Sequence, residues 1–289
     1  MRREVAVPAR RNPTARQVRL GTELRRLREA AGLKATEAAA QLGANSVQMS
    51  QIESGIAGVS EERVRRLAAI YACTDDALID ALVAMATDRT RGWWEEYRNT
   101  LPAAYQDLAE VDHHARFRKD VAVTHVPGLL QTEDYARALF AYMNPEFPES
   151  EVALRVEHRM KRRVVIDGPD PIPYETVIHE AALRIRVAGR AAFRAQLSRV
   201  LEVSEAGHVT VQVVPFALDD FAGAGSAMVH LGGAVPRLDT VVRDAPHGTA
   251  FIDSEAQLEH FRRLFRRVRG QALSPERSRN LIHQLAKEL

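Results

Sequence analysis

Cysteine is nearly absent from this sequence, which holds one, Cys73, among 289 residues. A single thiol cannot form an intrachain disulfide, and it excludes zinc sites built from several cysteines. The sequence also lacks an apolar run long enough to span a membrane, and Met1 to Glu4 lead into no apolar signal core. We therefore expect a cytoplasmic protein with no membrane segment.

The remaining composition is that of an ordinary globular protein, with 46% hydrophobic and 27% charged residues. At 289 residues the chain is long enough for two domains, each with its own core. Positive charge gathers near the start, because residues 1–32 hold nine basic and three acidic side chains. This placement suits contacts with DNA phosphates. The alternative is a solvated tail, which we favour for Arg2 and Arg3, whereas for Arg10, Arg11, Arg16 and Arg19 both interpretations stay open.

The most informative stretch is residues 20–55, where we expect three short helices, each followed by a glycine. A glycine takes the left-handed conformation that ends a helix without steric cost. Asn45 can cap the third helix through its side chain. The expected elements are a first helix on the apolar repeat Leu20, Leu24 and Leu27, helices over 35–42 and 46–53, and stops at Gly32, Gly43 and Gly55. Two helices joined by a tight turn predict a helix-turn-helix, although a plain helical hairpin is the alternative.

A family resemblance rests on residues Leu27-Arg28-Glu29, Gly32-Leu33, Ala39, Leu42-Gly43, Met49, Ile52-Glu53 and Gly55. In these positions the segment resembles the phage-repressor or xenobiotic-response-element (XRE) class of helix-turn-helix. The sequence departs from that pattern at Lys34, where a Thr cap is usual, at Ala38, where Leu is usual, and in lacking a proline after Gly55. The resemblance implies that Arg28 and Glu53 form a structural ion pair inside the domain, where an arginine fork suits a carboxylate.

The third helix would read DNA without any basic side chain. Met49 and Ile52 lie three residues apart and are assigned to the core. The resemblance implies that the base-facing positions are Ser46, Val47, Ser50 and Gln51. Glutamine can pair with adenine, serine can donate or accept a hydrogen bond, and valine can contact a thymine methyl group. For the DNA backbone we assign Lys34, Asn45, Gln48, Arg16 and Arg19, with Asn45 and Gln48 alternatively capping the helix.

The rest of the N-terminal region completes a five-helix domain. We expect a helix capped at Ser60 that runs to Tyr71, and another from about Thr74 to Ala86. We divide the chain into a flexible arm (1–12), the helix-turn-helix domain (13–88), a linker with a crossover helix (89–110) and a larger domain (111–289). The crossover helix would begin at Trp93, Trp94 and Tyr97, which act as anchors of an interdomain core or, alternatively, as a ligand cage.

A second resemblance lies beyond the linker, in Trp93-Trp94, Pro127 to Arg137, Glu180 to Leu183, Gln196-Leu197 and Val211 to Phe216. These segments resemble the C-terminal domain of unknown function that follows this helix-turn-helix in actinobacterial regulators of the WhiJ-like group. The resemblance implies a transcriptional regulator, often encoded beside a small partner protein. It departs after Glu110, where this chain has Val111-Asp112-His113-His114. As a possible effector or interdomain site we select Trp93, Trp94, Tyr97, Gln131 and Tyr135.

Overall we expect an α+β protein, with an all-α N-terminal domain followed by a larger α+β domain. The expected helices of the larger domain are 132–143, 149–163, 191–206, 254–270 and 274–289, and the expected strands are 117–126, 174–179, 208–215, 227–231 and 240–243. The helix over 254–270 has an arginine-rich face that could meet DNA or an acidic partner, although a solvated face is the simpler interpretation.

Motifs for catalysis are lacking. His179-Glu180 has no second histidine for a zinc protease helix, and Gly223 to Ser226 has no lysine for a phosphate loop. His113 and His114 would point to different sides of a regular element, so we expect no shared metal. We interpret Gly223–Ser226 and Gly232-Gly233 as hairpin turns or a flap over a pocket. We therefore expect no catalytic residue, cofactor or metal.

The sequence thus predicts a DNA-binding transcriptional regulator that binds a palindromic operator as a homodimer. Its C-terminal domain would respond to a small-molecule effector or a small partner protein. One alternative is an antitoxin-like interaction module that neutralises a neighbouring partner and regulates itself. A second alternative is an enzyme controlled by its own DNA-binding domain.

Overall fold

The computed structural model describes residues 12–219, 221, 226–245 and 248–289. The chain divides into two compact units, Met1–Arg91 and Gly92–Leu289, which are described separately. Most of the arm predicted over residues 1–12 lies outside the described residues, as do Arg10 and Arg11. The first helix begins at Ala15, and the Thr14 side chain caps it by accepting from the Gln17 backbone.

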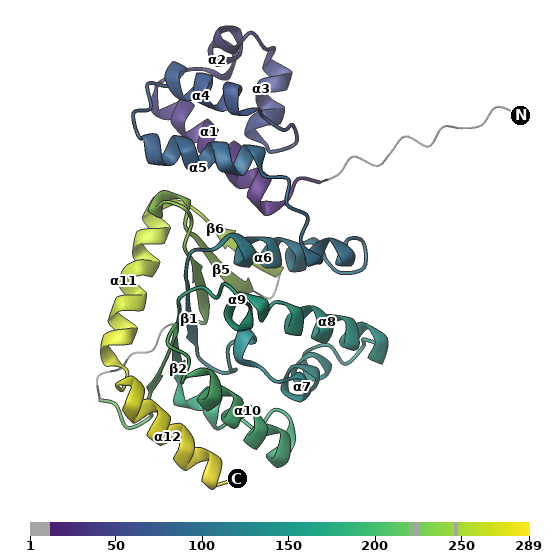
Figure 1. Ribbon diagram of the computed structural model, residues 1–289, viewed down its shortest axis with the longest axis vertical. Coiled ribbons are helices and arrows are strands. Elements are labelled where there is room, and N and C mark those ends of the chain that lie inside the picture. Colours follow the sequence, from purple (N-terminus) through teal and green to yellow (C-terminus); the bar gives the residue numbers. More distant parts are fainter. Residues whose placement is uncertain (1–11, 220, 222–225, 246–247) are drawn as a thin grey trace, which may run out of the picture. The chain divides into compact units, whose positions relative to one another are not determined.

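The first unit contains the five predicted helices (Figure 1). They are α1 (Ala15–Ala30), α2 (Ala35–Leu42), α3 (Ser46–Glu53), α4 (Glu61–Ile70) and α5 (Asp76–Thr87). The predicted bounds of α2 and α3 are confirmed, and α4 is capped by Ser60 as expected. The fifth helix differs slightly, because the cap is Asp75 and the helix starts one residue after it.

The core of this unit is formed by the apolar faces of all five helices. Its fully buried members include Leu24, Ala38, Met49, Val64, Leu67, Leu78 and Leu82. Helix α1 approaches the end of α3 so closely that a Cβ atom placed on Gly21 would lie 2.6 Å from the carbonyl oxygens of Ile52 and Glu53. Glycine at position 21 therefore sets the distance between these two helices.

The second unit is a six-stranded mixed sheet with helices on both faces. Its elements are, in chain order, η1 (Trp93–Tyr97), α6 (Ala103–His114), β1 (Arg118–Ala122), η2 (Gly128–Leu130), α7 (Glu133–Met143), α8 (Glu149–Lys161), α9 (Val164–Asp167), β2 (Tyr174–His179), η3 (Glu180–Leu183), α10 (Gly189–Val203), β3 (Val209–Val214), β4 (Met228–Leu231), η4 (Pro236–Leu238), β5 (Thr240–Ala245), β6 (Gly248–Ile252), α11 (Glu255–Gln271) and α12 (Pro275–Lys287). The strand order is β3-β2-β1-β4-β5-β6; β1, β2 and β3 run parallel, and the remaining neighbours are antiparallel.

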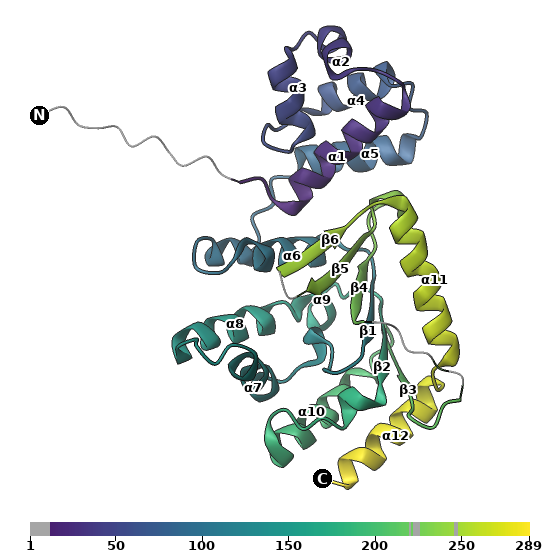
Figure 2. The same cartoon turned by 180° about the vertical axis from the view of Figure 1, so that it is seen from behind.

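The two faces of this sheet carry separate cores. Helix α11 covers one face and packs Leu258, Phe261, Phe265 and Val268 against strand residues such as Val121 and Val241. Helices α7 and α10 cover the other face, and α12 joins them beside β3 (Figures 1 and 2). The predicted α+β architecture is confirmed.

Three expected features of this unit are wrong in detail. No continuous crossover helix starts at Trp93, because η1 ends at Tyr97 and a new helix begins only after Pro102. Asn99, at a φ of 68°, lies in the intervening turn. Strand β6 was not predicted, although it pairs with β5 along its whole length. The strand expected over 117–126 is shorter, because the backbone after Ala122 turns towards η2.

Candidate nucleic-acid interface

The turn between α2 and α3 has the geometry that a helix-turn-helix requires. Gly43 ends α2 with a φ of 74°, and the Ala44 amide donates back to the Ala39 carbonyl. A left-handed residue of this kind reverses the chain within one turn. The Asn45 Oδ1 atom then accepts from the Gln48 amide at 2.8 Å, and the Gln48 Oε1 atom accepts from the Asn45 amide at 3.1 Å. The predicted cap at Asn45 is confirmed, and both side chains are used for capping.

The two faces of α3 separate as predicted. Met49 and Ile52 are buried among the other helices, whereas Ser46, Val47 and Ser50 are exposed. Val47 leaves 62% of its surface open to solvent. Gln51 is partly buried. The four predicted base-reading residues therefore lie on a side of α3 that the unit does not bury fully.

Residues assigned to the DNA backbone lie in different environments. Lys34 precedes α2 without a side-chain cap of its own, and the Glu37 carboxylate accepts from the Lys34 amide at 2.7 Å. Arg16 pairs with Asp88 at 3.5 Å and is partly buried. Arg19 differs from the prediction, because it is buried at 7% exposure and pairs with the fully buried Glu23. Its guanidinium forms an ion pair within α1 and is almost fully covered, so little of it is exposed at the surface.

The predicted ion pair of Arg28 and Glu53 forms with two parallel contacts. Arg28 Nε lies 2.6 Å from Glu53 Oε1, and Nη2 lies 3.0 Å from Oε2. The remaining terminal nitrogen donates to the Leu33 carbonyl at 2.8 Å. Both side chains are more than nine-tenths buried, and the hydrogen bond to Glu53 raises the pKa of Arg28. The pair joins α1, the end of α3 and the turn before α2.

One basic residue near the turn escaped the sequence interpretation. Arg66 on α4 is exposed, and its Nη2 atom donates to the Gln41 carbonyl at 2.8 Å. This bond holds a guanidinium beside the C-terminal end of α2. The sequence did not predict this contact, because Arg66 and Gln41 are 25 residues apart in the chain.

In the second unit, two of the three predicted aromatic residues, Trp93 and Tyr97, lie around a buried histidine. Their rings, and that of Tyr105, which was not predicted, have centroids 5.0 to 5.4 Å from that of His158 on α8. The third, Trp94, is buried and packs against His113 with centroids 4.9 Å apart. Burial lowers the pKa of His158 to about 3, with a further contribution from the positive charge of Arg162. The imidazole is therefore neutral at physiological pH, and the cluster is a packed part of this unit.

Gln131 and Tyr135, the other residues of the predicted effector site, are also buried. The Tyr135 hydroxyl accepts from the Val126 amide, and Gln131 Nε2 donates to the Val126 carbonyl at 2.7 Å. Gln131 Oε1 accepts from Arg159 Nη1 at 2.6 Å. Both side chains thus fix the segment that leaves β1, and they present little of their own surface to a ligand.

A buried charge network was not predicted. Arg118 bonds both Asp112 and Asp120, and Arg162 reaches Asp112 at 2.7 Å. The Tyr174 hydroxyl donates to Asp120 at 2.9 Å. The two arginines hold the pKa of Asp112 below its usual value despite its burial. Asp112 belongs to the segment that departs from the family pattern, and here it joins α6, β1 and the end of α8.

The histidine pair and the glycine segments are placed as follows. The rings of His113 and His114 contact each other, with centroids 4.9 Å apart, so they do not point to different sides as expected. The described part of the chain contains no group of three or more residues suited to hold a metal ion. Residues 222–225 lie outside the described residues. Gly232 and Gly233 begin the connection between β4 and β5, consistent with a hairpin turn.

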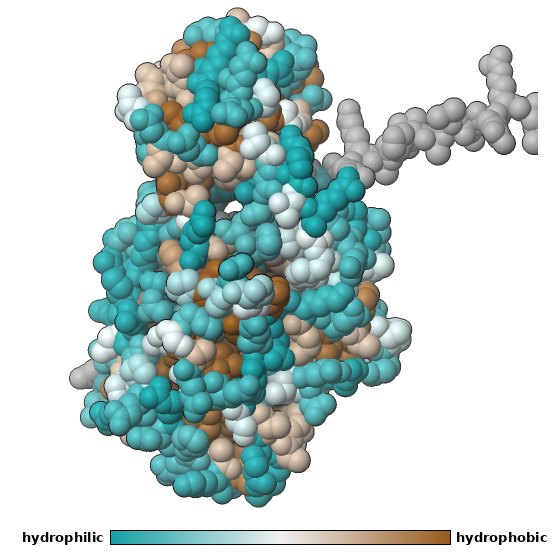
Figure 3. Space-filling view, in the orientation of Figure 1, coloured by the Kyte–Doolittle hydropathy of each residue, from teal (hydrophilic) through white to brown (hydrophobic). Residues whose placement is uncertain are grey.

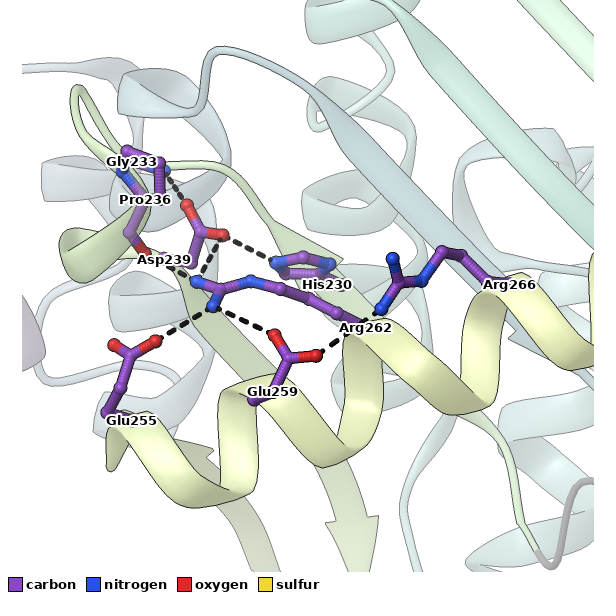
Figure 4. A network of polar contacts seen from close by, with 8 residues as sticks. All are labelled: His230, Gly233, Pro236, Asp239, Glu255, Glu259, Arg262 and Arg266. Atoms are coloured by element: carbon purple, nitrogen blue, oxygen red, sulfur yellow. Dashed lines mark hydrogen bonds and ion pairs between the residues drawn. The ribbon is translucent and has the colours of Figure 1, made fainter.

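The arginine-rich face of α11 is partly occupied by intramolecular ion pairs (Figure 4). Arg262 bonds Asp239 at 3.0 Å and Glu255 at 2.9 Å, and Asp239 also accepts from the buried His230. Arg266 pairs with Glu259, and Arg269 with Glu175. Figure 3 shows hydrophilic residues over much of the side that it draws, with apolar patches between them.

Comparison with known protein families identifies both units. A model described as a domain of unknown function, DUF5753, matches residues 105–284, which is more than half of the chain. The chain belongs to the DUF5753 family. A second model, described as a helix-turn-helix domain, matches residues 19–82. No curated protein and no solved structure matches the chain.

The two matches agree with the observed units. The helix-turn-helix match covers most of α1 and all of α2, α3 and α4, and the DUF5753 match begins within α6. The N-terminal unit therefore belongs to the type found in DNA-binding regulators. Within the described residues, no helix combines the length and apolar character needed to cross a membrane.

Proposed function

We propose that this protein is a sequence-specific transcriptional regulator of the XRE class that binds a palindromic operator as a homodimer. The observation that carries the proposal is the α3 surface: Ser46, Val47 and Ser50 are exposed on a helix whose other face is locked into the core by Met49 and Ile52. Helix α3 is the second helix of the helix-turn-helix motif, and in such motifs this helix enters the major groove of DNA.

Base recognition in this proposal depends on neutral side chains. Gln51 would pair with an adenine, the two serines would bond base edges, and Val47 would contact a thymine methyl group. The reading surface would thus favour A·T-containing steps. Affinity would come from phosphate contacts, for which Lys34 at the start of α2 and Arg66 beside the end of α2 are the candidate cations.

The C-terminal unit would receive the signal that controls DNA binding. This unit is large, has two separate cores and is a compact unit distinct from the first. These features support an independent sensing domain. The signal would be a small molecule or a small partner protein, and the protein would act in the cytoplasm as a repressor.

The test begins by selecting binding sites from random DNA with the full-length protein. Fluorescence anisotropy then measures the Kd for the selected site and for a scrambled sequence. We expect Gln51→Ala to lower the ratio of the two affinities at least about fivefold, because a good side-chain–base pair contributes about 1–3 kcal/mol of discrimination. Ser46→Ala should lower the ratio less.

The control is Gln271→Ala, which makes the same change at an exposed position of the second unit. It should leave both affinities unchanged. Equal wild-type affinities for the selected and scrambled DNA would refute the proposal.

A further inference from the structure

The arginine at position 159 differs from every other basic residue around it. Helix α8 and its C-terminal end carry a series of cations, and most of them are neutralised. Arg155 pairs with Glu151, Lys161 with Glu96 and Glu157, Arg162 with Asp112, and Arg163 with Asp167. Among the described residues, Arg159 has no carboxylate in ion-pair distance, and its hydrogen bond goes to the neutral Gln131 amide oxygen at 2.6 Å.

The guanidinium of Arg159 is nevertheless held firmly in one place. Its Cζ atom lies 4.2 Å from the centre of the Phe140 ring on α7. Gln131 is itself anchored, because its Nε2 atom donates to the Val126 carbonyl. A guanidinium has five N–H donors in a fixed fork, and Gln131 uses one of them here. The others are oriented in advance for an acceptor that the described chain does not supply.

A glycine lies directly beside this guanidinium. A Cβ atom placed on Gly128 would lie 3.8 Å from Arg159 Nε, so a larger side chain there would cover the fork. His125, on the same segment after β1, is partly buried. Burial, followed by the positive charge of Arg159, lowers the pKa of His125, which favours the neutral imidazole. A neutral imidazole can donate one hydrogen bond to an anion.

Electrostatics favour an anionic occupant. Burial and the neighbouring charge of Arg162 lower the pKa of Arg159 to about 10, so the group stays protonated at neutral pH without an ion-pair partner among the described residues. Asp244 on β5 is a partial counter-charge, because its carboxylate acts to raise the pKa of Arg159, but it forms no ion pair with Arg159 and accepts a hydrogen bond from Thr249.

We propose that Arg159, with Gln131 positioning it and Gly128 leaving room, binds the oxyanion of a small molecule, a carboxylate or a phosphate group. The planar fork matches two oxygens of either group. The proposal deepens the proposed function, because it names the chemistry of the effector that the C-terminal unit would sense.

The test is calorimetric titration of the full-length protein at pH 7 with sodium phosphate and, in a separate arm, with sodium acetate. Sodium chloride keeps the ionic strength constant in every titration, so that general screening does not count as binding. We expect saturable binding of at least one anion, and the two arms decide whether phosphate or carboxylate is the source. Arg159→Gln should weaken this binding at least tenfold.

Two further variants make the result specific. Gly128→Leu keeps the arginine but covers it, and it should weaken binding to a similar extent even if Arg159→Gln fails to fold. Arg163→Gln removes the same charge four residues away, where Asp167 already balances it, and binding should be retained. Absence of saturable binding in the wild type, or equal binding by Arg159→Gln, would overturn the proposal.

This failure is distinguishable from failure of the proposed function. Operator affinity is measured on the same samples without added anion. Intact operator recognition with no anion binding would reject the oxyanion site alone, whereas anion binding without sequence-specific DNA binding would reject the regulator proposal and leave the site standing.

Discussion

Substitution of Gly21 by alanine should destabilise the first unit, although the same change usually stabilises a helix. Alanine is favoured over glycine in a helix interior by about 1 kcal/mol. Gly21 is in the middle of α1, but its α-carbon faces the end of α3. The added Cβ atom would lie 2.6 to 2.7 Å from backbone atoms of Ile52 and Glu53. Backbone on both sides cannot rotate away, so the helices must separate.

The magnitude follows from two opposing contributions. Overpacking of a well-packed core costs about 1–3 kcal/mol, and here it exceeds the gain in helix propensity. Because the clash is with backbone atoms, we expect a cost in the upper half of this range, about 2–3 kcal/mol, and hence a net loss of about 1–2 kcal/mol in the free energy of unfolding. In a unit of this size, each kcal/mol lost lowers the melting temperature by roughly 4–8 °C. Because the displaced segment is the end of α3, operator affinity should fall as well.

Differential scanning calorimetry of the full-length protein would measure this change. The control is Gly270→Ala, in the last turn of α11, where a Cβ atom would meet nothing within 4 Å. This substitution should leave the melting temperature unchanged or raise it. A Gly21→Ala variant that melts at or above the wild-type temperature would show that α1 and α3 are not packed as described.

Three further predictions concern buried charge. Glu53→Gln should cost about 3 kcal/mol, because it removes the buried carboxylate that Arg28 contacts twice and leaves Arg28 only the exposed Glu29 at 3.7 Å. Glu61→Gln, in an exposed pair with Arg65, should change little, and urea denaturation would compare the two variants. Asp112→Asn should cost about 3–5 kcal/mol in the second unit, since it leaves Arg118 and Arg162 without their shared carboxylate, and a loss under 1 kcal/mol would contradict the network. The buried His158 should make the second unit less stable as the pH falls below about 6.5, the pKa of an unfolded histidine. Its pKa in the folded protein is about 3, so between these two values only the unfolded chain binds the proton. The free energy of unfolding should therefore fall by about 1.4 kcal/mol per pH unit. His158→Phe should remove that part of the slope between pH 7 and 5, while a control at the exposed His260 should keep it.

Local sequence signals were enough to predict those elements whose boundaries are set by residues at the boundary itself. Helices α2 and α3 were predicted to the residue because Gly43 has a φ of 74° and Asn45 bonds the amide three residues on. Helix α7 and strand β2 were predicted equally well, the first because Thr132 caps it. In each case the residues that decide the boundary are within a few positions of it.

Elements that depend on distant partners were not predictable in this way. Strand β6 carries little alternation, and it is a strand because β5 supplies its hydrogen-bond partners. The continuous helix expected from Trp93 failed because the aromatic side chains of η1 pack on α8, which is 60 residues away. Pro102 was the one local warning of a new helix start.

The same distinction explains which site residues were placed correctly. The role of Arg28 followed from a family pattern, and the geometry agrees with it. Arg19 was misplaced because a count of positive charge cannot tell a surface guanidinium from one that bonds a buried Glu23. Arg159 shows the converse. Nothing in its sequence neighbourhood separates it from Arg155 or Arg163, and it becomes distinctive only when the fold supplies carboxylates to those two and withholds one from it. Candidate ligand sites of this kind are found by asking which partly or fully buried charged side chains have no ion-pair partner after folding. Composition and motifs cannot answer that question.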